Sequence, residues 1–268
     1  MRTRFGCVAV AAISLLALAP LPVAGQTYQA PLTADGKPDL NGIWQAMGTA
    51  HWDLESHGAK QGPVIALGAA FSIPAGQGVV EGGAIPYQPA AAATKKANAE
   101  NWMTRDPEVK CYLPGVPRAM YMPYPFQIVQ TPKQILMTFE YAGAVRSVFM
   151  ATLEPSPVDT WMGQSSGRWE GATLVVDTTG FNGRAWFDRA GNFASDSLHV
   201  VERFTRTGPD HLTYEATIED PKVFTRPWKI RMPLYRRIDK PVQILEYKCV
   251  EFAEELLYGH LRKKPAGK

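Results

Sequence analysis

Residues 195–204, SDSLHVVERF, place an imidazole, two carboxylates and a guanidinium close together. If this stretch is a β-strand, its side chains alternate between two faces. Glu202 then lies on the face of Val200 and Phe204, while His199 and Arg203 lie on the other. Because a buried charge costs free energy unless it is paired, we expect Glu202 to have a basic partner in the core.

Arg146 is our first choice for the partner of Glu202, with Arg118 as the alternative. The pair has either a structural role, fixing strand register, or a catalytic role together with His199. A β-bulge would be needed to bring His199 and Glu202 to the same side.

His199 suits acid or base catalysis because an imidazole titrates near neutral pH. We expect a carboxylate close to it on a pocket rim, either Asp188 or Asp196. If the face that carries His199 is not the barrel interior, it looks to solvent instead. The candidate catalytic residues are His199, Asp188, Glu202 and Arg146.

Aromatic residues in the predicted loops could line an apolar pocket with a few polar groups, or could equally be core plugs. Trp186 follows the predicted turn at Asn182-Gly183 and is expected near His199. The candidate ligand-binding residues are Tyr141, Trp161, Trp186 and Arg203.

A further candidate is Ser165, since residues 163–167 match the G-x-S-x-G motif of serine hydrolases. That motif requires a strand before the serine and a helix after it. Residues 168–177, RWEGATLVVD, are typical of a strand instead, so the sequence favours a plain loop.

Motifs for metal or nucleotide binding are not found, since the sequence has no H-E-x-x-H, C-x-x-C, G-x-x-x-x-G-K-[ST] or helix-opening G-x-G-x-x-G. We therefore expect no metal and no cofactor. His51 and His57 lie in an irregular region, and we expect them at the surface. Without Arg2 and Arg4 the formal charge is nearly neutral, which argues against nucleic acid as a partner.

Residues 1–25 have the layout of a secretory signal peptide, with two arginines, an apolar run and small residues at its end. Pro20 and Pro22 interrupt the run, so we expect no stable membrane anchor. The sequence predicts a periplasmic or secreted protein. Cys111 and Cys249 remain after the signal and are expected to form a disulfide, the alternative being two unrelated buried thiols.

The pattern of elements predicts a mainly β protein with a single domain. Residues 26–125 form an irregular N-terminal arm with a short strand at 42–45 and one helix starting at Pro89. Residues 126–268 form the β body, in which short β-rich segments up to Cys249 are followed by a short helix. Sequential hairpins without helical crossovers predict an antiparallel meander that closes into a barrel or a strongly curved sheet.

Two resemblances add to this prediction. Gly42-Ile43-Trp44 resembles the G-x-W of lipocalins, although Trp44 could simply be a core aromatic. Four longer motifs resemble a family of exported bacterial proteins of unassigned function: DGKPDLNGIWQ, DPEVKCYLPGVPR, GRWEGATLVVDTTGFN and LHVVERF. The second resemblance implies no particular activity.

Three functions follow from these observations. The first is an exported enzyme that acts on a small apolar or aromatic molecule in a barrel pocket by acid/base chemistry, as a lyase, isomerase or hydrolase without a nucleotide cofactor. The second is a lipocalin-like protein that binds such a molecule without converting it. The third is a serine hydrolase that uses Ser165.

Overall fold

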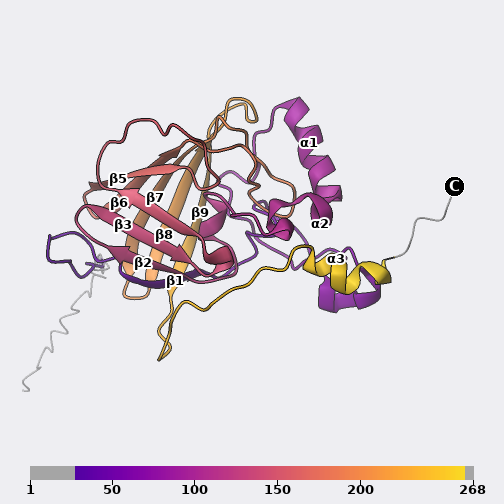
Figure 1. The fold of residues 1–268 in the computed structure, drawn as a ribbon, viewed down its shortest axis with the longest axis horizontal. Helices are drawn as coiled ribbons and strands as arrows, with labels where there is room; N and C mark the ends of the chain where they lie inside the picture. The colour runs from indigo at the N-terminus through magenta and orange to yellow at the C-terminus, as the bar shows by residue number, and fades with distance from the viewer. Residues whose placement is uncertain (1–27, 263–268) are drawn as a thin grey trace, which may run out of the picture.

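The strands of the protein follow one another around a closed barrel, in which β1 pairs with both β2 and β9 (Figure 1). The computed structural model describes residues 28–262, so the predicted signal peptide lies outside the described residues. The mainly β barrel predicted from the sequence is confirmed. Its strands are β1 (Gly42–Ala46), β2 (Phe126–Gln130), β3 (Gln134–Phe139), β4 (Val145–Phe149), β5 (Gln164–Glu170), β6 (Thr173–Thr179), β7 (His199–Gly208), β8 (His211–Glu219) and β9 (Trp228–Arg236).

The barrel departs from a pure antiparallel meander at one point, since β4 and β5 pair in parallel through Val148 with Ser165 and Phe149 with Ser166. A parallel pair requires the chain to return to the end of the barrel where β4 began. Residues 150–163, which include Pro155 and Pro157, make this connection in place of a hairpin.

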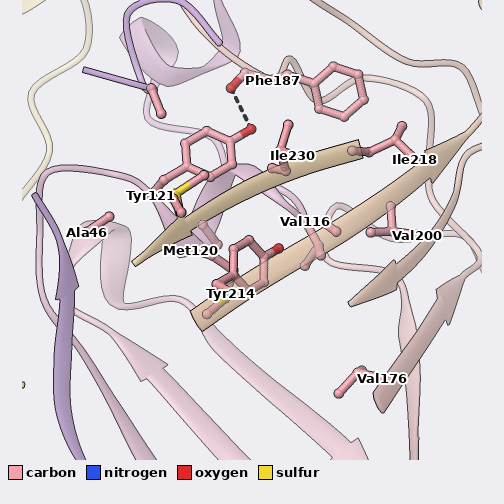
Figure 2. Packing of buried hydrophobic residues seen from close by; sticks show 14 of the residues in the cluster. Ala46, Val116, Met120, Tyr121, Val176, Phe187, Val200, Tyr214, Ile218 and Ile230 are labelled. Carbon is pink, nitrogen blue, oxygen red and sulfur yellow. Dashed lines mark hydrogen bonds between the residues drawn. The ribbon is translucent and has the colours of Figure 1, made fainter. Parts of the chain in front are cut away.

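The barrel interior is a packed core. On β7 and β8 every second residue is buried, including Val200, Phe204 and Tyr214. Residues 116–122 add Val116, Met120 and Tyr121 to this core, and Figure 2 shows the Tyr121 hydroxyl directed at the carbonyl of Phe187. Side chains thus occupy the interior that could otherwise have held a ligand.

The α-helices lie outside the barrel (Figure 1). The helix predicted to start at Pro89 is present, but it breaks at Asn101, whose φ of −125° is not helical. The predicted C-terminal helix is also present. The α-helices are α1 (Pro89–Glu100), α2 (Trp102–Arg105) and α3 (Ala253–Tyr258), and the 3₁₀ segments are η1 (Ile65–Phe71), η2 (Pro107–Lys110), η3 (Arg118–Met120), η4 (Tyr141–Gly143) and η5 (Gly259–Leu261).

Residues 242–249, predicted as a further strand, have no regular secondary structure. The reason is that β1 already pairs with β9 and closes the barrel, so no free edge is left for another strand. The segment crosses to the helical side of the molecule (Figure 1), where Cys249 is bonded to Cys111 with their Cα atoms 5.6 Å apart. The predicted disulfide is confirmed.

The edge of β9 is shared by two partners. Leu234, Tyr235 and Arg236 pair with β1, whereas the backbone of Lys229 and Arg231 bonds to residues 79–81 of the N-terminal arm. Arg231 N donates to Val79 O at 2.9 Å, and Glu81 N donates to Lys229 O at 2.9 Å. The arm therefore supplies part of the barrel wall, and Met232 and Pro233 lie between the two partners.

Within residues 28–262 no helix combines the length and the apolar character needed to cross a membrane.

Candidate functional site

The ion pair predicted from the strand pattern is present inside the barrel. Arg146 Nη1 on β4 donates to Glu202 Oε1 on β7 at 3.1 Å, and both side chains are buried. Three hydroxyls complete the network: Arg146 donates to Ser165 Oγ at 3.0 Å and to Thr178 Oγ1 at 2.9 Å, and Tyr214 donates to Glu202 Oε1 at 2.8 Å. Because its charges are paired and hydrogen bonded, the cluster is a stable part of the core.

Ser165 is a member of this buried network. Its hydroxyl contacts Arg146 and Thr178, and among the described residues no histidine is a hydrogen-bond partner of it. The serine lies within strand β5 rather than on a turn between a strand and a helix. These contacts give Ser165 no base that would activate it as a nucleophile.

His199 lies on the outer surface of the barrel, where 37% of its side chain is exposed. Its Nε2 is 3.1 Å from Asp177 Oδ1 on β6, and its Nδ1 is 3.8 Å from Glu219 Oε2 on β8. On the same face Arg203 donates to Glu170 at 2.8 Å. The histidine thus has a carboxylate partner, but that partner is Asp177 rather than Asp188 or Asp196, and the pair belongs to an exposed charge ladder.

Asp188 is not a hydrogen-bond partner of His199. It is fully buried in the loop between β6 and β7, where its Oδ2 accepts from Leu54 N at 2.8 Å and from Asn192 Nδ2 at 2.6 Å. Burial raises its pKa to about 7, and the negative charge of Asp53 adds to this effect. The expectation of a tight hairpin at Asn182-Gly183 is corrected here, because residues 180–198 form a long loop that carries Asp188 away from β7.

The remaining ligand-binding candidates are dispersed. Tyr141 is buried and donates to the carbonyl of Glu108 at 3.0 Å, and Trp161 stacks on Tyr112. Trp186 packs against Trp102 and its neighbours. Trp161 and Trp186 do line one hollow, but its volume of about 10 Å³ holds no ligand. The pocket wall that we expected around His199 is not formed by these residues.

A second ionic cluster lies outside the barrel, around Glu108. Its carboxylate accepts from Arg189 and Arg118, each at 2.8 Å. Although burial alone would raise the pKa of Glu108, the charges of Arg189 and Arg118 lower it to about 2. His51, expected at the surface, lies beside this cluster, and burial together with the Arg189 charge lowers its pKa to about 4. Arg189 is held between Trp52 and Trp102, 4.7 Å from each ring centroid.

A cavity of about 310 Å³ opens where β1 and the N-terminal arm separate along β9. Ala46, the last residue of β1, lines one side, and Val79 of the arm lines the other. The buried ring of Tyr121 belongs to the lining, while its hydroxyl is occupied by Phe187 O at 3.0 Å. The complete lining is Ala46, Met47, Gly48, Thr49, Ala50, Asp53, Ala75, Gly76, Gln77, Gly78, Val79, Tyr121, Met232 and Pro233.

Two glycines let the arm come close enough to form this cavity. Gly78 has a φ of +79°, and a Cβ there would lie 2.5 Å from the backbone nitrogen of Ser56. A Cβ on Gly76 would lie 2.2 Å from Thr49 Oγ1 and 2.6 Å from the His57 ring. A larger residue at either position would push the two walls apart.

Asp53 belongs to the cavity lining and is only 8% exposed. The turn before it is fixed because Trp52 N and Asp53 N both donate to Thr49 O, at 2.9 and 3.2 Å. Asp53 Oδ1 accepts from Glu55 N at 3.0 Å, whereas Oδ2 has no hydrogen-bond donor in the part of the chain that the structure describes. One carboxylate oxygen is therefore available to a ligand.

Sequence reasoning did not select Asp53. The available signal was a single acidic residue between apolar Trp52 and Leu54, within a segment otherwise rich in glycine and alanine. An acidic residue in such a setting is unusual, because burial of a carboxylate requires compensation.

In comparisons with protein families, curated proteins and solved structures, nothing matches this chain. Residues 28–262 also contain no group of three or more His, Cys, Asp or Glu side chains arranged to hold a metal ion. The functional assignment therefore depends on the geometry of the cavity.

Proposed function

We propose that this chain is an exported protein that binds a small, partly apolar molecule in the cavity between Ala46 and Val79. The observation that carries the proposal is the cavity itself, with a buried carboxylate in a lining that is otherwise largely apolar. Small-molecule sites in proteins are typically concave and mostly apolar, with a few polar groups that orient the ligand. A volume of about 310 Å³ corresponds to a compact ligand.

Binding fits the geometry better than acid/base catalysis. A catalytic acid or base must reach the reacting atoms directly or through one water molecule. None of His199, Asp188, Glu202 and Arg146 belongs to the lining of this cavity. The lipocalin-like alternative is therefore the stronger one, with the difference that the ligand lies at a break in the barrel wall rather than inside the barrel.

Two features support export of the protein. The N-terminal sequence has the layout of a signal peptide. The bond between Cys111 and Cys249 fits an oxidising compartment, since structural disulfides are rare in a reducing cytosol. We propose that the ligand is met in the periplasm or outside the cell.

Native mass spectrometry with three probes tests the binding function: benzyl alcohol, benzylamine and benzoate. We expect a complex with at least one probe in the wild type and its loss in Ala46→Phe, which fills the cavity. Val129→Phe, at an exposed position of β2 away from the cavity, is the matched control and should bind like the wild type. The proposal fails if no probe binds the wild type or if Ala46→Phe binds as well as the control.

A further inference from the structure

The geometry points to a cationic ligand, with an ammonium or amidinium group bound to Asp53 Oδ2 and an apolar or aromatic body against Met232, Val79 and the ring of Tyr121. This inference rests on the proposed binding function and specifies the chemical class of the ligand.

The first observation that supports a cationic ligand is the charge of the cavity lining. Among the fourteen residues that line it, Asp53 is the one with a formal charge at neutral pH, and no lysine, arginine or histidine belongs to the lining. The carboxylate is 8% exposed, and the basic group nearest to it, His57, stands 3.9 Å away without a hydrogen bond, so its charge is only partly compensated. A cation in the cavity supplies that compensation through a charge-assisted hydrogen bond.

The second observation is that the groups around Asp53 leave its Oδ2 without a hydrogen bond. The nearest basic group is His57, whose Nδ1 is 3.9 Å from Asp53 Oδ2 and therefore beyond hydrogen-bond distance. Both ring nitrogens of His57 face backbone carbonyls instead, Glu55 O at 2.8 Å and Pro74 O at 3.0 Å. Lys95 is directed elsewhere, to Glu55 Oε2 at 3.5 Å. Oδ2 thus keeps its capacity to accept a hydrogen bond from a ligand.

The third observation concerns the apolar and aromatic residues of the cavity lining. Tyr121 is the aromatic residue of the lining, and because its hydroxyl donates to Phe187 O, it offers no free hydroxyl to a ligand. An aromatic face attracts a cation, and the methionine, valine and proline side chains suit an apolar body. The site therefore combines an anionic group with apolar and aromatic surface, which is the complement of an aryl or alkyl amine.

Calorimetric titration with benzylamine, benzyl alcohol and benzoate tests this inference. The three probes are similar in size but differ in charge. We expect the wild type to bind benzylamine at least about tenfold more tightly than benzyl alcohol, because a hydrogen bond to a charged group is stronger than a neutral one. Benzoate should bind most weakly.

Two variants locate the effect. Asp53→Asn keeps an oxygen that can accept from Glu55 N but removes the charge, and it should abolish the preference for benzylamine. Asp177→Asn removes an acidic group from the outer face of the barrel and should preserve the preference. If Asp53→Asn fails to fold, the ranking of the three probes on the wild type and the weakening of benzylamine binding by salt still decide the outcome.

The results separate the two proposals. Equal or tighter binding of benzyl alcohol overturns the cationic ligand but leaves the binding function intact. If none of the three probes binds the wild type, both proposals are contradicted. If Asp53→Asn keeps a wild-type preference for benzylamine, the cation binds elsewhere and the assignment to Asp53 is wrong.

Discussion

Arg146 on β4 and Glu202 on β7 form an ion pair inside the barrel, although two strands separate β4 from β7 in the sheet. Ser165 on β5 and Thr178 on β6 bridge the intervening strands by accepting hydrogen bonds from the same guanidinium. With Tyr214 on β8, which donates to Glu202, the network links five consecutive strands, starting with the parallel pair β4 and β5. It holds together the part of the barrel where the meander is interrupted.

Replacement of Glu202 by glutamine should lower the free energy of unfolding by about 3–5 kcal/mol, because it leaves Arg146 charged and buried without its counter-ion. Urea denaturation measures this change. Glu219→Gln, at an exposed position of β8, is the control and should have only a small effect. The double variant Arg146→Met/Glu202→Leu should recover much of the loss. A loss of less than about 1 kcal/mol in Glu202→Gln would contradict the structural role of the pair.

The disulfide should contribute strongly to stability, since its two cysteines are separated by 138 positions. In the chain-entropy model a loop of this length corresponds to about 4–5 kcal/mol. Cys111→Ser/Cys249→Ser should therefore unfold at a markedly lower urea concentration than the wild type. Unchanged unfolding of the double variant would show that the bond does not constrain the chain as we infer.

Asp188 should make stability depend on pH. Its pKa is about 7 in the folded protein against an ordinary value of 3.8, so the folded state keeps a proton that the unfolded chain releases between these values. The contribution of Asp188 to stability is therefore fully present below about pH 4 and falls, by roughly 4 kcal/mol, as pH rises to about 7.

Asp188→Asn should remove this slope, so the variant gains stability relative to the wild type between about pH 5 and pH 8. Asp196→Asn is the control, because the hydrogen bond from Lys222 lowers the pKa of Asp196, which titrates below this range. Thermal melts at several pH values measure both differences. The same pH slope in wild type and Asp188→Asn would show that Asp188 is ionised throughout.

His199→Ala should have little effect on folding or on ligand binding, because His199 forms an exposed side-chain contact with Asp177 and does not line the cavity. Exposed pairs contribute at most about 1 kcal/mol. The probe affinities of this variant, measured as for the wild type, should be unchanged. A large loss of probe affinity with intact thermal stability would show that His199 belongs to the binding site.

The barrel could be predicted from the sequence because the alternation of apolar and polar residues on β7 and β8 records which side chains face the core. The same alternation placed Glu202 in the core and so predicted a basic partner for it, for which Arg146 was the first choice and Arg118 the alternative. It could not tell whether the opposite face, which carries His199, borders a pocket or solvent, since a strand pattern of period two gives two faces but not their surroundings. The cavity could not be predicted from the sequence for another reason. It depends on contacts between residues 46–53, 75–79 and 232–233, which are distant in sequence and have no periodic signal.

The position of the ligand is tested most directly by NMR of the protein labelled with ¹³C at its methionine methyl groups. Met47 and Met232 line the cavity, whereas Met103 packs beside Trp102 and Met150 lies against Gly167. Met47→Leu and Met232→Leu assign the two cavity signals. We predict that benzylamine shifts the signals of Met47 and Met232 in a saturable manner and leaves those of Met103 and Met150 in place. Saturable shifts confined to Met103 or Met150, with Met47 and Met232 unmoved, would contradict the assignment of this cavity as the binding site.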